Sequence, residues 1–459
     1  MPKELISTDP GHGYEEVGRI KISTKEEIKD AVAKARGAYP MWRALSVKER
    51  AEYFRKFLAL HRKCGKELAE LMTREMGKPI TESLREVDVR AVMLERDVDR
   101  AEKVLAPKVL DEFETYRTEL HLEPFGVCAS IAPWNFPTSQ FFIGVGQPLL
   151  SGNTVVFKHS EECPLSSKFL ADLMDEAGFP DGVFTCLYGA GDVGKTLMEQ
   201  DIDLISFTGS SKVGEMLYKI AAEKFIPAVL EMGGSSPAVV FEDVDIKKTA
   251  ASIFGERFGN CGQICAALKR LYVHESILDE LVAELKTLAE AQTVGDPLDA
   301  KTTVGPLVAE RQLDLLETQV DDARKKGATI VTGGKQPDGL SGAYFLPTIL
   351  TNVTPGMRVV SEEVFGPVLP VMSFKDEKEA IAIANSLPYG LSAFVYSKDA
   401  KRADRVASAL ESGQVSINGF SYFSPNAPFG GYKRSGIGRM RGNIGFYYVT
   451  QEKVIARPK

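Results

Sequence analysis

Apolar residues change their spacing along the chain, and each change predicts a different kind of element. Between Ser46 and Glu75, and again between Thr81 and Val104, they recur every three or four positions with charges between them, so we expect the first hundred residues to be largely helical. Ser46 followed by Glu49 fits a capping box at the start of a helix. From Phe113 to Leu122 apolar and polar residues alternate, which predicts strands with one exposed face.

Two later blocks alternate short apolar runs with helical stretches. The first block predicts helices at 164–177, 193–199 and 212–223, between strands at 127–132, 154–158, 183–187, 204–207 and 228–231. The second block, from about residue 237 to 430, predicts strands at 270–274, 329–332, 368–374, 392–396 and 414–418. This alternation is typical of parallel, doubly wound α/β sheets, which bind ligands outside the carboxyl ends of their strands. The tail from Phe446 to Ala456 is expected to form an edge strand.

Composition narrows the class of protein without identifying it. A chain of 459 residues is too long for one hydrophobic core, so two or three domains are expected. The net charge of −7 leaves no basic footprint for nucleic acid. No apolar run approaches the roughly 18 residues of a membrane span, and the first residues do not begin a signal peptide. Six cysteines are too few for a disulfide scaffold, which favours a cytoplasmic protein.

Cys265 and Glu231 have surroundings that suggest chemistry. Cys265 ends a run of small and amide residues at 258–265, and a cysteine thiolate attacks carbonyl carbons. Glu231 stands just before two glycines, so backbone can approach its carboxylate closely. Each also has an ordinary interpretation, because free cysteines usually behave as small buried hydrophobes and a strand-end glutamate is usually a surface charge. Cys261 lies four residues before Cys265, but no second Cys/His pair stands at zinc spacing, so no metal is expected.

These two residues belong to an ordered set of motifs that spreads over about two-thirds of the chain. The set comprises Pro133–Pro137, Phe207–Ser210, Leu230–Gly234, Phe258–Cys265, Glu362–Pro367 and Pro428–Gly431. Together they resemble the aldehyde dehydrogenase superfamily, the NAD(P)-dependent enzymes that oxidise aldehydes to acids. The chain departs from the family pattern at Ser235, where a lysine often follows the glycines, and at His159, which replaces the usual proline.

The resemblance implies an aldehyde dehydrogenase-like α/β fold with two doubly wound, Rossmann-like domains and a small β oligomerisation segment. We expect residues 1–107 and 125–232 to form the NAD(P)-binding domain and residues 233–428 the catalytic domain. Residues 108–124 and 444–459 would then supply the oligomerisation strands, giving a homodimer or homotetramer. Strand-like segments outside both α/β blocks would leave exposed edges that invite pairing with another chain.

The resemblance also implies roles for three residues. Cys265 is the expected nucleophile, while Cys261 falls at a variable position of the same motif. Glu231 would activate the water that hydrolyses a thioester, and its presence disfavours the CoA-acylating relatives. The amide of Asn135, with the backbone N–H of Cys265, would hold the oxyanion of a thiohemiacetal. Taken alone, Asn135 beside prolines would be read as a turn residue.

Cofactor binding rests on several shorter signals. The segment 209–214 joins a predicted strand to a helix without the G-x-G-x-x-G fingerprint, and its backbone N–H groups suit a pyrophosphate. The cofactor is expected to be NAD or NADP, with NAD preferred, because a carboxylate at Glu161 accepts ribose hydroxyls and repels a 2′-phosphate. The residues expected to contact the cofactor are Trp134, Lys158, Ser160, Glu161, Gly209, Ser210, Gly214, Glu363 and Phe365.

Three functions of other kinds were weighed. Residues 189–196 satisfy the P-loop pattern, but the next predicted strand ends without the acidic residue that would hold Mg²⁺. A Cys–His hydrolase would have to use His159 or His274, and neither lies in a motif with an orienting Asn or Asp. A non-catalytic binding or structural protein fits poorly with an intact set of Cys265, Glu231 and Asn135.

The substrate is expected to be a small aldehyde. Residues 265–270, the Lys158–His159 pair and the short N-terminus look most like a succinate-semialdehyde dehydrogenase branch. The better-known branch carries an arginine six residues before its cysteine, which grips the substrate carboxylate, and here Gly259 occupies that place. Another cation would have to serve. Lactaldehyde, glyceraldehyde or a broad aldehyde range remain alternatives.

Overall fold

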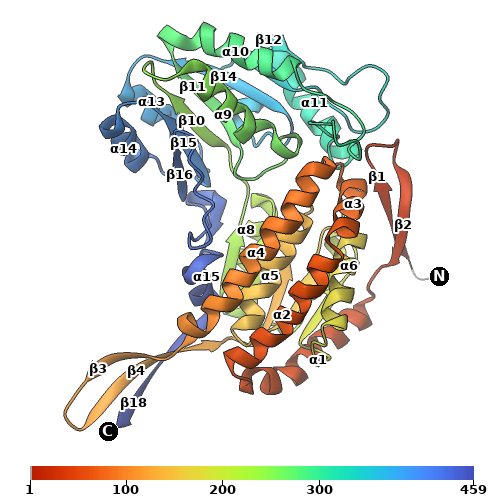
Figure 1. Cartoon of the computed structure of the whole chain (residues 1–459), viewed down its shortest axis with the longest axis vertical. Helices are drawn as coiled ribbons and strands as arrows, with labels where there is room; N and C mark the ends of the chain where they lie inside the picture. Colours follow the sequence, from red (N-terminus) through yellow and green to blue (C-terminus); the bar gives the residue numbers. More distant parts are fainter. Residues whose placement is uncertain (1–2) are drawn as a thin grey trace.

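The computed structural model, which describes residues 3–459, contains two mostly parallel sheets, one antiparallel arm and a two-stranded hairpin near the N-terminus (Figure 1). The larger sheet lies in the upper part of Figure 1 and the smaller one behind the long helix α4, Ile80–Leu105. The fold is therefore the expected α/β fold with two doubly wound sheets and a small antiparallel segment.

The first sheet has the strand order β17-β9-β8-β5-β6-β7. Its parallel strands are β5 Val127–Ile131, β6 Thr154–Lys158, β7 Phe184–Leu187, β8 Leu204–Thr208 and β9 Ala228–Glu231, and β17 Gly436–Ile437 adds an antiparallel edge. Alternate residues of these strands enter two different cores, as the period of two requires. One core contains residues of α2 Val47–Lys63, α3 Gly65–Met76, α4, α5 Pro137–Leu150 and α6 Pro164–Glu176. The other contains residues of α1 Lys25–Ala44, α7 Gly191–Met198 and α8 Ser211–Lys224.

The second sheet has the order β12-β13-β14-β11-β10-β15-β16. Its strands are β10 Ser236–Val240, β11 Leu268–His274, β12 Thr329–Thr332, β13 Thr348–Thr351, β14 Val368–Phe374, β15 Ser392–Tyr396 and β16 Gln414–Ile417. All neighbours pair in parallel except β12 with β13. Helices α9 Ile246–Phe258 and α10 Leu278–Glu290 share one core with this sheet, and α13 Glu377–Ala384 and α14 Ala400–Ala409 share another. Residues of α11 Glu310–Lys325 and α12 Arg358–Ser361 belong to a further core.

The arm projects from the body at the lower left of Figure 1 and carries the C-terminus at its tip. It consists of β3 Lys108–Glu112, β4 Tyr116–Pro124 and β18 Thr450–Pro458, paired antiparallel with β4 in the middle. Every residue of β3 is exposed, including the apolar Val109 and Leu110. The alternation from Phe113 to Leu122 therefore marks the turn and second strand of a real hairpin.

Three details differ from the expected elements. Residues 4–21 form a hairpin of β1 Glu4–Asp9 and β2 Glu15–Lys21, although the start of the chain was expected to be helical. The helix expected from Ser46 to Glu75 is two helices, interrupted at Cys64; both contact α4, so the apolar spacing continues across the break. The strand expected from Phe446 begins only at Thr450, because residues 442–448 form helix α15, with Phe446 fully buried.

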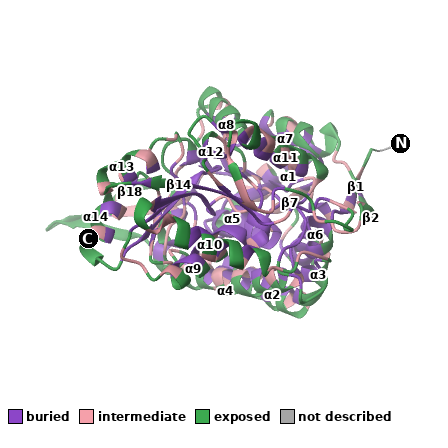
Figure 2. Ribbon diagram, turned by 90° about the horizontal axis from the view of Figure 1, so that it is seen from above, coloured by how far each residue is buried: buried purple, intermediate pink, exposed green. Residues whose placement is uncertain are grey.

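Burial follows this layering, as Figure 2 shows: the strands and α5 are largely buried, while the outer helices carry exposed faces. Helix α5 is buried along almost its whole length, which makes it the central helix beneath the first sheet. None of the helices within residues 3–459 is both long and apolar enough to cross a membrane.

Candidate active site

A cavity of about 270 Å³ lies where the two sheets approach each other. The loops after β5 and β8, at carboxyl ends of the first sheet, form one wall, and strand order reverses between these two strands. The loop before β11, at the amino end of the second sheet, supplies Cys265. The lining residues are Pro133, Trp134, Asn135, Thr208, Gly209, Ser210, Met232, Gly233, Cys265, Gln312, Leu315, Glu363 and Phe365.

The two neighbouring cysteines occupy different environments. Cys265 is half-buried and lines the cavity. Cys261 is buried in an apolar core with Val304 and Leu307, and its thiol pKa is raised by burial. Burial also raises the pKa of Cys265 to about 11, although the Lys269 ammonium opposes the shift. A thiol that lines the cavity is available for reaction, so the geometry favours Cys265 over Cys261.

Asn135 is fixed by the loop that carries Cys265. Its amide Nδ2 donates to the carbonyl of Gln263 at 2.9 Å, and its own carbonyl accepts from Asn260 Nδ2 at 2.9 Å. Gln263 is in turn held because its Oε1 accepts from Val308 N at 3.0 Å. One Nδ2 hydrogen of Asn135 is thus used for positioning, which leaves the other available for a ligand oxygen in the cavity.

Glu231 ends β9 and is only 2 % exposed. In the described part of the chain, neither of its carboxylate oxygens has a hydrogen-bond partner. Burial therefore raises its pKa well above the usual range, against a weaker opposing effect of Arg439. Gly430 explains how the carboxylate fits: a Cβ at Gly430 would lie 2.6 Å from Glu231 Oε1, so only glycine allows the approach.

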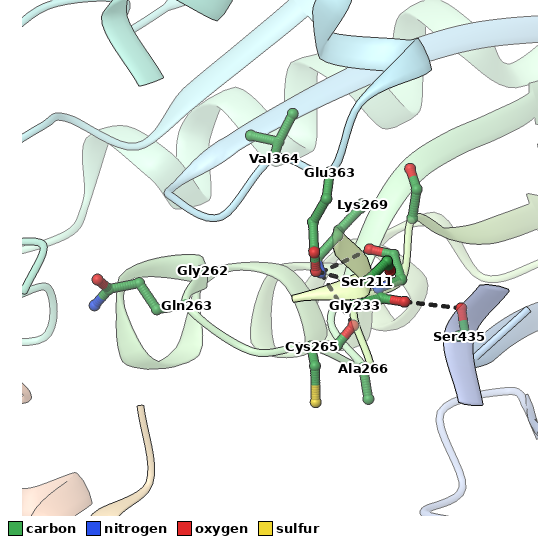
Figure 3. Close-up of polar contacts among 12 residues, drawn as sticks. Ser211, Gly233, Gly262, Gln263, Cys265, Ala266, Lys269, Glu363, Val364 and Ser435 are labelled. Carbon is green, nitrogen blue, oxygen red and sulfur yellow. Dashed lines mark hydrogen bonds and ion pairs between the residues drawn. The ribbon is translucent and has the colours of Figure 1, made fainter. Parts of the chain in front are cut away.

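Figure 3 shows an ion pair between the buried Lys269 and the partly buried Glu363, beside the loop that carries Cys265. The Lys269 ammonium also donates to the carbonyls of Gly234 at 2.8 Å and Cys265 at 3.0 Å. Glu363 accepts from the backbone N–H of Gly234 at 3.2 Å. The Cys265 sulfur points away from this pair in the view of Figure 3. The buried ammonium group of Lys269 thereby connects three of the sequence motifs, Leu230–Gly234, Phe258–Cys265 and Glu362–Pro367.

Five of the residues expected to contact the cofactor line the cavity: Trp134, Gly209, Ser210, Glu363 and Phe365. The rings of Trp134 and Phe365 meet edge to face, with centroids 5.6 Å apart. Ser210 is the N-cap of α8, where its hydroxyl accepts from Val213 N at 3.4 Å. Gly214 does not line the cavity; a Cβ there would lie 2.2 Å from Met232 Sδ, so it brings α8 close to the sheet.

Lys158, Ser160 and Glu161 form a separate group at the carboxyl end of β6. The Lys158 ammonium is buried and lies 3.3 Å from the Glu161 carboxylate. Burial would raise the pKa of Glu161, but Lys158 outweighs it and the pKa is lowered, so the group is a carboxylate. The Ser160 hydroxyl accepts from Glu162 N at 3.3 Å. These residues do not line the cavity that contains Cys265.

The P-loop-like segment is arranged as an ordinary helix start. Lys195 lies exposed on α7, and the Thr196 hydroxyl donates to the carbonyl of Asp192 at 3.0 Å within the same helix. The two histidines weighed above also have other surroundings. His159 is buried against Phe157, and burial lowers its pKa to about 3. His274 lies at the surface, where its Nδ1 contacts Ser276 Oγ at 2.8 Å.

Sequence reasoning missed the partners that hold the named residues. Lys269 stands at the start of β11, where its motif carries no signal of an ion pair with a residue far along the chain. Asn260 and Gln263 were part of a motif, but their contacts with Asn135 depend on the fold. Arg90 and Arg441, which line a separate small cavity, also belong to no sequence motif.

The architecture is that of the doubly wound α/β enzymes, and comparison with known proteins narrows it further. The aldehyde dehydrogenase family profile matches residues 2–455. Succinate-semialdehyde dehydrogenase [NADP(+)] from Deinococcus radiodurans is 38% identical over 455 residues, which cover 99% of this chain and 95% of the relative. Glutarate-semialdehyde dehydrogenase from Pseudomonas aeruginosa is 37% identical over 92% of this chain and 88% of the relative. Betaine aldehyde dehydrogenase from Bacillus subtilis is also 37% identical, over 96% of this chain and 92% of the relative.

Solved structures agree with the sequence relatives. The crystal structure of a putative aldehyde dehydrogenase from Burkholderia cenocepacia superposes with a TM-score of 0.96 at 32% identity, covering 99% of this chain and 94% of that one. The chain therefore belongs to the aldehyde dehydrogenase family. The resemblance inferred from the motifs is confirmed.

Proposed function

We propose that this aldehyde dehydrogenase oxidises succinate semialdehyde to succinate with NAD or NADP, through a thioester on Cys265. The observation that carries the proposal is that Cys265 and Asn135 line one cavity with Glu363, Trp134 and Phe365. The named relatives support the substrate class, because two of them act on semialdehydes by name. Lactaldehyde, glyceraldehyde or a broad range of aldehydes are the alternative substrates, since other relatives carry other names.

The residues present suit a dinucleotide. The start of α8 borders the cavity at Gly209 and Ser210, and the first backbone N–H groups of this helix would hold a pyrophosphate there. Glu363 offers a carboxylate for a ribose, and Glu161 offers another beside β6. The bound cofactor supplies the hydride acceptor for the oxidation.

Cys265 performs the first step by adding its sulfur to the aldehyde carbon, which forms a C–S bond and leaves an oxyanion. The free Nδ2 hydrogen of Asn135 and the backbone N–H of Cys265 hold that oxyanion. Loss of one such donor costs roughly 10²–10³ in rate. Because burial raises the thiol pKa to about 11, the thiolate is scarce at neutral pH, and the positive charge of Lys269 favours it.

Glu231 performs the last step. After hydride leaves the carbon, the acyl group is a thioester on Cys265, and water must attack it. Glu231 accepts a proton from that water, the C–S bond breaks, and the carboxylic acid and the thiol are released. A carboxyl group whose pKa is raised by burial is a stronger base once ionised, which suits this role.

The expected preference for NAD over NADP follows from Glu161. Its carboxylate accepts hydrogen bonds from two ribose hydroxyls and repels a 2′-phosphate, whereas buried Lys158 beside it partly offsets the repulsion. We therefore expect kcat/KM for NAD to exceed that for NADP. Steady-state kinetics with both cofactors at saturating aldehyde test the ranking, and a preference for NADP of about tenfold, or 1.4 kcal/mol, would reverse it.

Variants at Glu231 and Cys265 test the proposed mechanism. Glu231→Gln should allow attack and hydride transfer but stall at the thioester, giving a burst of reduced cofactor of at most about one per active site. Mass spectrometry should find the acyl group on Cys265. Cys265→Ala should abolish turnover while cofactor binding persists.

Cys261→Ala is the matched control, because Cys261 lies in the apolar core beside the same loop. It should keep the burst and the turnover. Turnover of Glu231→Gln at the wild-type rate, or acylation of Cys261 in that variant, would contradict the assignment.

A further inference from the structure

Two arginines from distant parts of the chain meet where helices α4, α5 and α15 pack together. Arg90 lies on α4, and Arg441 is the N-cap of α15. Both guanidinium groups donate to one acceptor, the sulfur of Met93, at 2.9 Å from Arg90 and 3.3 Å from Arg441. Within residues 3–459, this thioether is the only side-chain acceptor that either guanidinium reaches. A thioether is a weak acceptor for two full positive charges.

The charges around this pair leave it short of negative charge. Glu86 forms an ion pair with the buried Lys78 and accepts from Ser139. Asp97 lies 3.4 Å from Arg100. Each nearby carboxylate thus has another cation as its ion-pair partner. Burial lowers the pKa of Arg441 to about 10, and repulsion between the two guanidinium groups adds to this shift, although Asp97 opposes it.

The pair borders a small cavity with both apolar and polar walls. Besides the two arginines, its lining residues are Met93, Leu94, Phe142 and Ile143 on the apolar side and Asp97, Ser139 and Gln147 on the polar side. The cavity measures about 30 Å³, close to the share of one water molecule. A carboxylate therefore fits only if the Met93 side chain turns aside, and methionine has the rotational freedom to do so.

Two further observations connect the pair to the reaction. The electrostatic interaction between Arg90 and the Cys265 thiolate favours the charged form of Arg90, so the two side chains are close enough to influence each other. Arg441 has φ 69 and ψ 170, a conformation that side chains other than glycine rarely adopt. Its backbone N–H donates to Gln147 Oε1 at 3.2 Å, which fixes this conformation and points the residue at the cavity.

We propose that Arg90 and Arg441 together bind the carboxylate of an aldehyde substrate that carries an acid at its far end, displacing the Met93 thioether. This inference rests on the proposed function. It identifies the cation that takes the place of the arginine six residues before the cysteine in the better-known branch, where this chain has Gly259. Planar guanidinium groups bind carboxylates with paired, charge-assisted hydrogen bonds. An aldehyde bonded to Cys265 would then be held at both ends, which selects ω-carboxylated aldehydes over neutral ones of the same length.

The test compares succinate semialdehyde with butanal, which has the same chain length and no carboxylate. The quantity measured is kcat/KM for succinate semialdehyde divided by kcat/KM for butanal. In Arg90→Met and in Arg441→Met, this ratio should fall at least about tenfold below the wild-type ratio, since a charged hydrogen bond is lost. Arg90→Lys should keep part of the preference. Arg96→Met is the control, an exposed arginine of the same helix, and should leave the ratio unchanged.

A second measurement needs only the wild-type enzyme and covers variants that fail to fold. Butanoate should compete with butanal, and butanamide, its neutral isostere, should compete at least about tenfold more weakly. Equal inhibition by the two, or an unchanged ratio in both methionine variants, would overturn the inference. If the wild type oxidises neither aldehyde, the proposed function fails; if it oxidises both without preference, only the arginine site fails.

Discussion

Lys269 places an ammonium group in the interior beside the loop that carries Cys265. A buried ammonium is costly unless it is paired and hydrogen-bonded, and here Glu363 and two carbonyl groups satisfy it. Its charge favours the ionised form of Cys265, while Glu363 and Glu231 oppose it. The balance among these groups controls how much thiolate is present at a given pH.

Lys269→Met should therefore slow chemical modification of Cys265. Removing the cation leaves Glu363 unpaired beside the thiol, so the thiol pKa should rise above about 11. Below the thiol pKa, the thiolate fraction rises about tenfold per pH unit. Alkylation by iodoacetamide should therefore speed up by the same factor in both enzymes. At any one pH the variant should react more slowly. Peptide mass spectrometry of cofactor-free protein gives the rate for Cys265 separately from Cys261.

The double variant Lys269→Met/Glu363→Gln is the matched control. It removes both charges, so the alkylation rate should return part of the way to the wild-type rate. Alkylation of Lys269→Met at the wild-type rate across pH 7 to 9 would show that this ammonium does not influence the thiol.

The sequence could identify residues with a local motif but not those whose role depends on the fold. Cys265 and Asn135 were named from short motifs, and the structure places both on one cavity. Gly214 was expected at the cofactor, yet its contact is with Met232. Arg90 gave no signal because an arginine on an amphipathic helix ordinarily faces solvent. Its partner Arg441 comes from the other end of the chain.

At the scale of elements, period and turn chemistry predicted the five parallel strands of the first sheet and five of the seven strands of the second, but not β10, β13 or β17. They failed where tertiary contacts outweigh local preference. The aromatic run at 446–448 has strand propensity, but Phe446 reaches the first core only from helix α15. The break between α2 and α3 left no gap in the apolar spacing, because both helices contact α4. The hairpin β1–β2 pairs strands that carry no strict alternation.

Helix α7 gives a prediction at this scale. It begins in the P-loop-like segment, yet Lys195 is exposed and the Thr196 hydroxyl bonds within the helix. Lys195→Ala should leave aldehyde oxidation within about a few-fold, since no acidic Mg²⁺ ligand accompanies the segment. A coupled assay for phosphate release tests the alternative directly. Mg²⁺-dependent ATPase activity that disappears in Lys195→Ala would restore the nucleotide-hydrolysis interpretation.

The antiparallel arm of β3, β4 and β18 leads us to expect that copies of the whole molecule associate. Val109, Leu110 and Val454 are 53 %, 50 % and 61 % exposed, and β3 offers an open strand edge. Exposed apolar edges of this kind favour pairing with another chain. We propose that the arm is an oligomerisation segment and that the enzyme is a homodimer or homotetramer.

Leu110→Glu should weaken this association, because it places a charge at one of the two exposed apolar positions of β3. Multi-angle light scattering at micromolar concentration should give the mass of two or four chains for the wild type and a shift toward the monomer for the variant. Leu340→Glu, at an exposed leucine far from the arm in sequence, should keep the wild-type mass. A wild-type mass of one chain would refute the proposal.

The pairing of β17 with β9 has a consequence for the order of folding during synthesis. Gly436 lies opposite Glu231, and the Ser435 carbonyl accepts from Met232 N at 2.9 Å, so a late segment of the chain closes the edge of the strand that bears Glu231. A ribosome releases β9 long before β17, and non-local pairs of this kind form late. Until residue 436 emerges, β9 has an open edge. A nascent chain can therefore assemble most of both sheets before the edge beside Glu231 is closed.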